Sequence, residues 1–564
     1  MASTFSPEEP SPNPSHREGD QIPSPSGRGL GRGSSSDRAR VAGHVLDDIA
    51  LFSRHVVGLP LYDYQLEPLR AIIDAVLHRR GHEFLLVFPR QSGKNEAVAQ
   101  LLVYLLTLLQ RRGGQMVYGA IGDGLGRGMR RLEQRLDTPW TRGRWRRGGR
   151  PTRYTLGRAA VVFLSSHPQA ASRGETADHL LIIDEAQEQD AAHIESVFTP
   201  MRAAHNATAV YLGTVRQTGD FLWAKKGELE SATAADGVPR VFMVPPETVA
   251  AENPAYAAFL AEQVRRYGRR HPIVAAEYFL EPVDGQGGLF PPWRVAFMRG
   301  AHSRLSGPRP DEVYVAAVDL AGQDEGAAEV GAQLRNPGRD YTVVTIFRVE
   351  TEFLDGTETE FLPRNSVSNG PIYEAVDVFV DHGSRHFQAT PGRPRLADTL
   401  LTTLRRWNVV HTIIDASGVG QGLADWLAGA LGRERVTAYQ LGGAGAKARL
   451  GSDLLALIDT GRFRYWGGDE DEPLSDGWWF WQQVVACGYA LPGAGRFDHD
   501  LRWGVPAAAR VSTPRGSEPL HDDRLLSAAL VAELERRRQA GALFLGASAS
   551  RVVRGGDPLS GANF

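Results

Sequence analysis

The chain has 564 residues, of which 42% are hydrophobic and 23% are charged, and its formal net charge is −3. A single hydrophobic core stops growing at about 250–300 residues, so we expect at least two domains. The composition excludes a fibrous or wholly disordered protein, and the single cysteine, Cys487, excludes a disulfide framework and a Cys-rich zinc site. No apolar run reaches the about 18–20 residues that a membrane-spanning helix needs, so we expect no membrane contact.

The two ends of the chain have the composition of tails. Pro, Ser and Gly account for 20 of the first 38 residues, and large apolar residues are rare there. Such a composition cannot form a packed core, so we predict a disordered tail over residues 1–40. The last residues, 541–564, are rich in Gly, Ala and Ser and predict a second tail.

Short apolar runs alternate with helical stretches in the first half of the chain. Helical periodicity covers 41–56, 65–78 and 96–110, and strand-like runs lie at 84–88, 115–120, 161–164, 179–183 and 209–212. Strands that alternate with helices indicate a parallel sheet covered on both faces. We therefore predict an α/β domain over residues 41–285.

A Gly- and Pro-rich stretch at 284–292 indicates a domain boundary, and we expect a linker over residues 286–308. Strand-like runs then follow at 313–318, 342–348, 375–380 and 409–414, with helical stretches at 396–407, 423–431 and 525–538. Since strands dominate early and helices late, we predict a mixed α/β domain over residues 309–540.

A candidate phosphate-binding loop follows the first strand, at residues 89–96. A loop between a strand and a helix presents backbone N–H groups and the positive helix end to phosphate. Gly93 permits close approach, and Lys94 can reach the β and γ phosphates of a nucleotide. Asn95 stands where a Mg²⁺-binding Ser or Thr is common. We expect the other contacts to come from Arg90, Gln91 and Ser92.

A second nucleotide motif is the apolar run 180–183, which ends in Asp184 and Glu185. Asp184 at a strand end can hold Mg²⁺ through water, and Glu185 can orient and deprotonate the attacking water. Thr214 follows the next strand and could sense the γ phosphate, while Gln65 could hydrogen-bond adenine. Together these residues predict an ATP and Mg²⁺ site.

Acidic residues end two strands of the second domain. Asp319 and Asp415 each follow an apolar strand and precede small residues, and Asp522 and Asp523 open a helix after His521. Such carboxylates can converge on a pair of Mg²⁺ or Mn²⁺ ions that activates water and stabilises the leaving oxygen of a phosphodiester. We predict Asp319, Asp415 and Asp523 as catalytic metal ligands, with Asp522 an open alternative to Asp523. Asp340 is a weaker fourth candidate.

These two sites, in this order, resemble the large terminase subunit of tailed double-stranded DNA bacteriophages over residues 60–535. The loop 90–95 is similar to the deviant Walker A motif of that family, and residues 172–186 are similar to its Walker B region. Gly213 and Thr214 match its coupling motif. The acidic positions 319, 415, 522 and 523 match its ribonuclease H-like nuclease.

The resemblance implies a P-loop ATPase domain followed by a ribonuclease H-like nuclease domain. It implies a viral packaging motor that drives double-stranded DNA into a procapsid with ATP and cuts the concatemeric genome. Expected partners are the portal protein, the small terminase subunit and further copies of the chain in a ring. The expected location is the host cytoplasm, transiently at the procapsid portal. Arg90 matches a cis-acting arginine of the family or makes a general phosphate contact.

Two other functions remain open on the sequence alone. A cellular helicase–nuclease would need a second helicase-type ATPase domain, and the one convincing phosphate loop lies at Lys94. A DNA-bound scaffold with a degenerate nucleotide site is favoured by Asn95 and disfavoured by Lys94, Asp184 and Glu185. The Arg-rich segment 140–154 is either a contact to DNA phosphates or a solvated loop, and we assign it no site.

Overall fold

The computed structural model describes residues 43–170, 172, 174–217, 219–284, 286–321, 341–350, 370–381, 386–389, 392–417, 420–442, 445–469, 472–491 and 497–543. The tail expected at 1–40, nearly all of that expected at 541–564, and Asp340 lie outside these residues. The chain divides into two compact units. We call them the N-terminal unit (up to Glu262, with Ala275–Asp284) and the C-terminal unit (Gln263–Val274, and from 285 onward).

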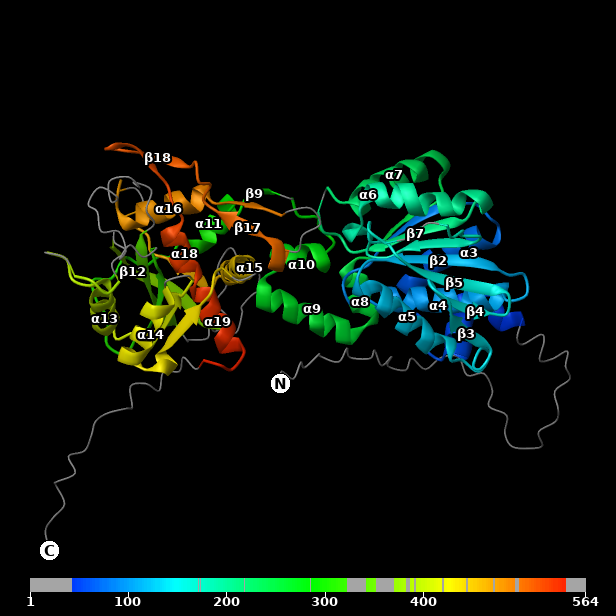
Figure 1. The fold of residues 1–564 in the computed structure, drawn as a ribbon, viewed down its shortest axis with the longest axis horizontal. Helices are drawn as coiled ribbons and strands as arrows, with labels where there is room; N and C mark the ends of the chain where they lie inside the picture. The colour runs from blue at the N-terminus through cyan, green and yellow to red at the C-terminus, as the bar shows by residue number, and fades with distance from the viewer. Residues whose placement is uncertain are drawn as a thin grey trace, which may run out of the picture. The chain divides into compact units, whose positions relative to one another are not determined.

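The N-terminal unit is built on an eight-stranded sheet of order β3-β4-β5-β2-β6-β7-β1-β8 (Figure 1). Its strands are β1 (Glu83–Val87), β2 (Gly114–Ala120), β3 (Trp145–Gly148), β4 (Thr152–Leu156), β5 (Ala159–Ser165), β6 (Leu180–Ile183), β7 (Thr208–Gly213) and β8 (Val241–Met243). The strands from β5 to β8 in this order are parallel, and β4 and β3 extend the edge antiparallel. The parallel sheet predicted from the alternating pattern is therefore confirmed.

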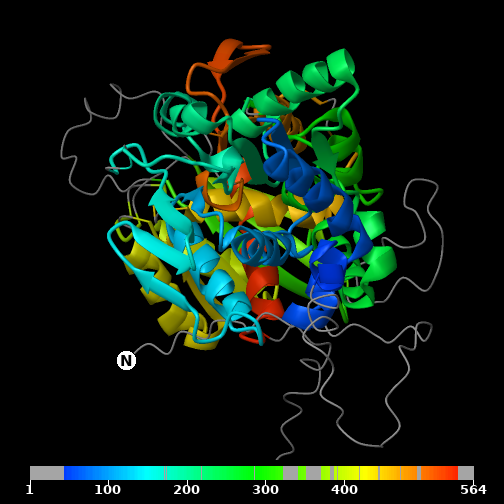
Figure 2. The ribbon, with the colours of Figure 1, turned by 90° about the vertical axis from the view of Figure 1, so that its right-hand side faces the viewer.

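Helices cover both faces of this sheet (Figures 1 and 2). One apolar cluster joins α3 (Asp63–Leu77), α4 (Lys94–Leu109) and α5 (Asp123–Leu136) to one face. A second cluster joins α7 (Phe221–Asp236) and the segment 194–201 to the other face. The remaining elements of this unit are α2 (Ile49–Phe52), η1 (Ser53–Val57), η2 (Ala186–Glu188), α6 (Ala191–His193), η3 (Ile194–Phe198), η4 (Thr199–His205) and α8 (Pro246–Glu252). The residues of α9 (Pro254–Tyr267) and α10 (Pro272–Glu277) are divided between the two units, since Gln263–Val274 belongs to the C-terminal unit.

The C-terminal unit is built on a six-stranded mixed sheet of order β14-β13-β10-β11-β12-β15. Its strands are β10 (Val313–Asp319), β11 (Thr342–Glu350), β12 (Ile372–Asp381), β13 (His411–Asp415), β14 (Val436–Tyr439) and β15 (Phe463–Tyr465). β10, β11 and β12 run antiparallel in succession, and β13 and then β14 add parallel to β10. A mixed sheet with parallel and antiparallel strands confirms the α/β class predicted for this part of the chain.

Both faces of the second sheet are also covered. α13 (Leu396–Arg406) and α14 (Gly420–Leu431) pack on one face, and α15 (Ala446–Asp459), α16 (Asp476–Ala486) and α18 (Asp523–Ala529) pack on the other. The smaller elements are β9 (Gln286–Gly288), α11 (Pro292–Met298), η5 (Arg433–Arg435), β16 (Gly488–Ala490), α17 (Phe497–Asp500), β17 (Arg502–Gly504), β18 (Arg510–Thr513), β19 (Gly516–Pro519) and α19 (Val531–Gln539). In the described part of the chain, no helix is long and apolar enough to cross a membrane.

The segment 286–308, which the sequence predicts as a linker, carries regular structure of the C-terminal unit. β9 pairs with β16, and α11 contributes Met298 to the core. Arg294 of α11 makes a two-pronged ion pair with Asp459 of α15, with Nε and Nη2 each 2.7 Å from a carboxylate oxygen. Both side chains are buried, so the segment is fixed in the domain.

Arg294→Met should lower the free energy of unfolding of the C-terminal unit by about 3–5 kcal/mol, because it leaves the Asp459 carboxylate buried without its partner. Denaturant unfolding measures the change. Arg395→Met is the matched control, since Arg395 pairs with Asp398 at the surface and such pairs contribute less than about 1 kcal/mol. Equal stability of the two variants would show that the pair of Arg294 and Asp459 does not hold this segment in the C-terminal unit.

Candidate active sites

The phosphate loop lies between the end of β1 at Val87 and the start of α4 at Lys94. Gly93 has a φ of +85°, and a Cβ at this position would lie 2.7 Å from Nε2 of Gln65, so the loop needs glycine there. Gln91 also has a positive φ, +64°, a conformation that costs energy and often marks functional loops. The Ser92 hydroxyl donates to the Pro89 carbonyl at 2.7 Å and closes the turn.

Gln65 supports the phosphate loop from the start of α3. Its Oε1 accepts from the Tyr62 N–H at 3.0 Å, and its Nε2 donates to the Gly93 carbonyl at 3.2 Å. The neighbouring Tyr64 hydroxyl donates to the Ser92 carbonyl at 2.7 Å. The structure thus places Gln65, which the sequence predicts as an adenine contact, against the backbone of the loop.

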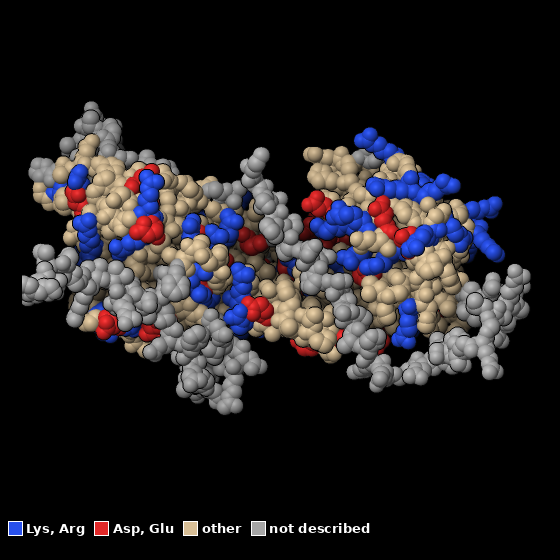
Figure 3. Space-filling model, turned by 90° about the horizontal axis from the view of Figure 1, so that it is seen from below, with Lys and Arg blue, Asp and Glu red and all other residues tan. Residues whose placement is uncertain are grey.

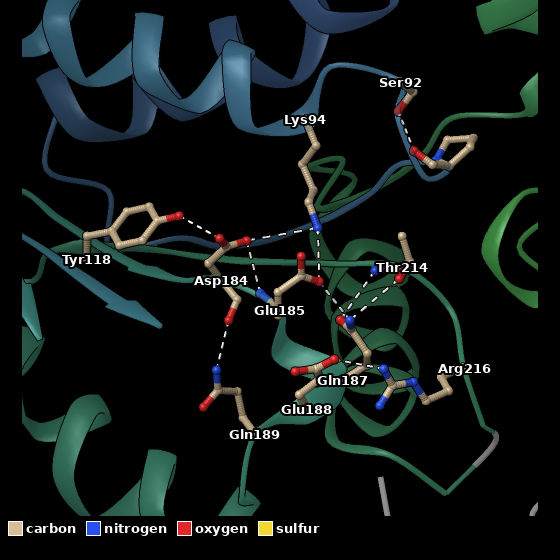
Figure 4. Close-up of polar contacts among 11 residues, drawn as sticks. Ser92, Lys94, Tyr118, Asp184, Glu185, Gln187, Glu188, Gln189, Thr214 and Arg216 are labelled. Carbon is tan, nitrogen blue, oxygen red and sulfur yellow. Dashed lines mark hydrogen bonds and ion pairs between the residues drawn. The ribbon is translucent and has the colours of Figure 1, made fainter. Parts of the chain in front are cut away.

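The acidic pair lies directly opposite Lys94 (Figure 4). The Lys94 ammonium lies 3.4 Å from Oε2 of Glu185 and 3.9 Å from Oδ1 of Asp184. These side chains meet because β1 and β6 both flank β7 in the parallel sheet, so their carboxyl ends share one edge. The predicted residues Lys94, Asp184 and Glu185 therefore form one cluster.

The two carboxylates of this cluster have different surroundings. Asp184 is buried, and its oxygens accept from the Tyr118 hydroxyl at 2.6 Å and the Glu185 N–H at 3.0 Å. Burial raises the pKa of Asp184 above its ordinary value, although Lys94 opposes this. The nearby Lys94 ammonium lowers the pKa of Glu185 and keeps this carboxylate ionised. Two carboxylates whose pKa values are shifted in opposite directions are suited to two different roles.

Gln187 is a site residue that the sequence reasoning missed. Its Nε2 donates to Oε2 of Glu185 at 2.8 Å, and its Oε1 accepts from the Thr214 N–H at 3.3 Å (Figure 4). The amide therefore connects the predicted catalytic carboxylate with the predicted sensor at the end of β7. The sequence could have indicated Gln187 as a site residue because it lies only two residues after Glu185, in a short turn.

Arg90 and Asn95 complete the loop. The Arg90 guanidinium contacts the Glu277 carboxylate at 2.6 Å, and its backbone N–H donates to the Glu277 carbonyl, so its side chain is bound to the end of α10. Oδ1 of Asn95 is buried and has no hydrogen-bond partner among the described residues. An amide oxygen is a hard ligand of the type that Mg²⁺ accepts, so Asn95 fits a metal beside the phosphates.

The second candidate site lies at the ends of β10 and β13. These strands pair in parallel, with Val318 opposite Ile414, so Asp319 and Asp415 follow side by side on neighbouring strands. Asp319 is buried, while Asp415 is partly exposed and accepts from the Ser417 N–H at 2.9 Å. This register places the two residues at adjacent strand ends, and their role as metal ligands stays a prediction.

The neighbouring side chains of Asp522 and Asp523, at the start of α18, have different partners. Asp523 is buried, and its Oδ2 accepts from the Tyr341 N–H, next to β11, at 3.2 Å. One turn later, the Ser527 hydroxyl contacts the carbonyls of Ala317 and Val343, so this face of α18 lies over β10 and β11. Asp522 instead forms an ion pair with Lys447 at 3.2 Å. The geometry favours Asp523 as the residue that faces the sheet.

The donor chemistry of this second site is all-oxygen, as Mg²⁺ or Mn²⁺ requires. Among the described residues, however, no group of three or more His, Cys, Asp or Glu side chains is close enough to hold a metal ion. The structure therefore brings Asp319 and Asp415 to neighbouring strand ends with Asp523 over the same sheet, and it does not close them into a three-ligand cluster.

No family model matches the chain, and no curated protein matches it. Solved structures similar to it include the large terminase of a thermophilic bacteriophage, with 11% identity, 84% of this chain and 99% of that chain covered, and a TM-score of 0.41. The HK97 bacteriophage large terminase has 13% identity, coverage of 86% and 99%, and a TM-score of 0.35. The magnesium-bound large terminase nuclease of the thermophilic phage G20c has 14% identity, coverage of 44% and 96%, and a TM-score of 0.27. These likenesses concern the fold.

Proposed function

We propose that the chain is the ATP-driven motor and nuclease of viral DNA packaging. In this proposal the N-terminal unit hydrolyses ATP, the C-terminal unit cuts phosphodiester bonds with Mg²⁺ or Mn²⁺, and the substrate is double-stranded DNA. The observation that carries it is the cluster of Lys94, Asp184 and Glu185 at one edge of a parallel sheet. The same chain carries Asp319 and Asp415 at the ends of two paired strands of the second sheet.

In the N-terminal unit, Lys94 would neutralise the β and γ phosphates, and the N–H groups of residues 93–95 would hold them. Glu185, kept ionised by Lys94, would orient the attacking water and accept its proton. Asp184 and Asn95 would hold Mg²⁺, which supplies charge neutralisation at the phosphate oxygens. Thr214 would report the loss of the γ phosphate to Glu185 through Gln187.

Gln187→Ala should lower the ATP turnover number by about 10- to 100-fold with little change in nucleotide affinity, because Glu185 loses the amide that fixes its orientation. Steady-state ATPase kinetics measure both quantities. Gln134→Ala, an exposed glutamine on α5, is the matched control. A wild-type turnover number for Gln187→Ala would show that Glu185 is positioned by other groups.

In the C-terminal unit, Asp319, Asp415 and Asp523 would hold the divalent ions. Such ions supply activation of water and stabilisation of the leaving oxygen. The buried Asp319 and Asp523 would be fixed by the strands and by α18, and the more exposed Asp415 would stand where the DNA backbone approaches. Asp522 would remain with Lys447 outside the ligand set.

The order of the two proposed sites supports the packaging role, as does the motif resemblance of the phosphate loop and of the residues around Asp184. In this role the partners would be the portal protein of a procapsid, the small terminase subunit and further copies of the chain in a ring, within the host cytoplasm. ATPase assays with and without double-stranded DNA, paired with plasmid cutting in Mg²⁺, Mn²⁺ or chelator, test the proposal. ATP binding without turnover would favour the scaffold, and unwinding of duplex DNA would favour the helicase–nuclease.

A further inference from the structure

Positive charge is concentrated in one stretch of the chain. Residues 123–158 contain eleven arginines and three acidic residues, a net charge of +8, although the whole chain has a net charge of −3. This stretch forms α5 and the antiparallel ribbon of β3 and β4 at the edge of the first sheet. In the view of Figure 3, Lys and Arg side chains gather over the unit at the right, the one that holds these elements in Figure 1. Such a local excess is typical of a surface that binds a polyanion.

We call this region the arginine surface and define it by the exposed arginines of the stretch. They are Arg127, Arg130, Arg142, Arg144, Arg146, Arg147, Arg150 and Arg158. Arg142 and Arg147 pair with Asp137 and Glu133. Arg130, Arg146, Arg150 and Arg158 have no ion-pair partner among the described residues. Their charges can bind phosphates without breaking an internal ion pair, and each phosphate contact releases a condensed counterion.

The aromatic residues of this stretch are used for packing. Tyr154 is fully buried, Trp145 lies against it with ring centres 6.1 Å apart, and Trp140 packs edge-on against Phe52 at 6.2 Å. A surface for single-stranded nucleic acid would present aromatic rings on which bases stack. Trp140 and Trp145 are half-buried by these contacts, so the arginine surface presents mainly cations. It therefore matches the regular phosphate backbone of a duplex and carries no base readout.

We propose that the arginine surface binds the phosphate backbone of double-stranded DNA without sequence preference. The inference rests on the proposed function for the identity of the polyanion. It assigns DNA contact to a segment that the sequence alone leaves undecided between a DNA contact and a solvated loop.

The arginine surface is joined to the nucleotide site through α5. Gly128 of α5 lies against the Tyr118 ring, where a Cβ would be 3.0 Å from its hydroxyl, and that hydroxyl donates to Asp184. On the other side, Arg131 and Arg135 of α5 bind both oxygens of Glu96, in the first turn of α4. Because α5 contacts Glu96 directly and Asp184 through the Tyr118 hydroxyl, we expect DNA on this surface to change the rate of ATP turnover.

The test measures binding of a short fluorescent duplex to the full chain by anisotropy, in chelator so that the DNA is not cut, at several salt concentrations. Arg146→Glu/Arg150→Glu should weaken binding by about tenfold or more and reduce the slope of log affinity against log salt by about two. Arg146→Lys/Arg150→Lys should bind as the wild type, because it keeps the charge. Arg54→Glu/Arg433→Glu, two exposed arginines outside the surface, is the matched control. Arg130→Gln/Arg158→Gln tests the surface independently at positions on other elements.

Equal binding by the surface variants and the wild type, or an equal loss in the control, would overturn the inference. Tighter binding of a single strand of the same length would overturn it as well. In a second arm, ATP turnover is measured with and without duplex in the Asp415→Ala background, and Arg146→Glu/Arg150→Glu should lose any DNA-dependent change. If no ATPase activity is found in any protein, the proposed function fails, while the anisotropy result still decides whether this surface binds DNA.

Discussion

Glu185→Gln should leave ATP binding intact and lower ATP hydrolysis by about 10²- to 10⁴-fold, the range attributed to a positioned general base. The glutamine amide has nearly the same size as the Glu185 carboxylate and can still contact Lys94 and Gln187. It cannot accept the proton of water. Lys94→Ala should instead remove nucleotide binding, since it removes the cation that would neutralise the β and γ phosphates. Equilibrium binding of a fluorescent nucleotide and phosphate release distinguish these two defects.

Lys226→Ala is the matched control for Lys94→Ala. The chain has few lysines, and Lys226 lies on α7, where it pairs with Glu230. It should bind and hydrolyse ATP as the wild type does. Hydrolysis at the wild-type rate by Glu185→Gln would transfer the role of base to another group.

Asp415→Ala should abolish metal-dependent cutting of DNA, because neighbouring carboxylates rarely restore the geometry of a two-ion site. Asp523→Ala should do the same, whereas Asp522→Ala should retain cutting, since Asp522 is engaged by Lys447 and Asp523 faces the sheet. Plasmid relaxation and linearisation in Mg²⁺ or Mn²⁺ measure the activity. Asp425→Ala, an exposed aspartate on α14, is the matched control. Full cutting by Asp415→Ala would remove this sheet edge from the proposed nuclease site.

The strands that carry both candidate sites could be predicted from the sequence. β1, β6, β10 and β13 are apolar runs that lie near their predicted bounds, and their carboxyl ends meet where parallel pairing places them. The reason is physical: a strand buried on both faces is apolar along its whole length, and the first polar residue after it lies at the sheet edge.

Other features depended on contacts that no local pattern contains. Gln65 caps α3 and holds a loop 28 residues away, which spacing alone does not reveal. β3 and β4 lie in an Arg-rich stretch in which few residues are apolar, and of these two strands only Tyr154 and Leu156 are buried. The choice between Asp522 and Asp523 depended on helix phase, because one residue rotates a side chain by about 100°.

The segment 286–308 shows a second kind of limit. Gly and Pro favour a boundary in the sequence, yet the buried pair of Arg294 and Asp459 joins this segment to α15, far along the chain. Long-range ion pairs of this kind leave no periodic signal. The single helix predicted over 41–56 also differs from the structure, where this segment forms shorter pieces, the last of which are α2 and η1.

The measurement that tests the central claim most directly is a paired assay of ATP hydrolysis and DNA cutting on the full chain, as wild type, Glu185→Gln and Asp415→Ala. Two separate active sites in one chain predict that the wild type has both activities. They also predict that Glu185→Gln cuts DNA without hydrolysing ATP, and that Asp415→Ala hydrolyses ATP without cutting DNA. Loss of both activities in either folded variant, or absence of both from the wild type with divalent metal and DNA present, would contradict it.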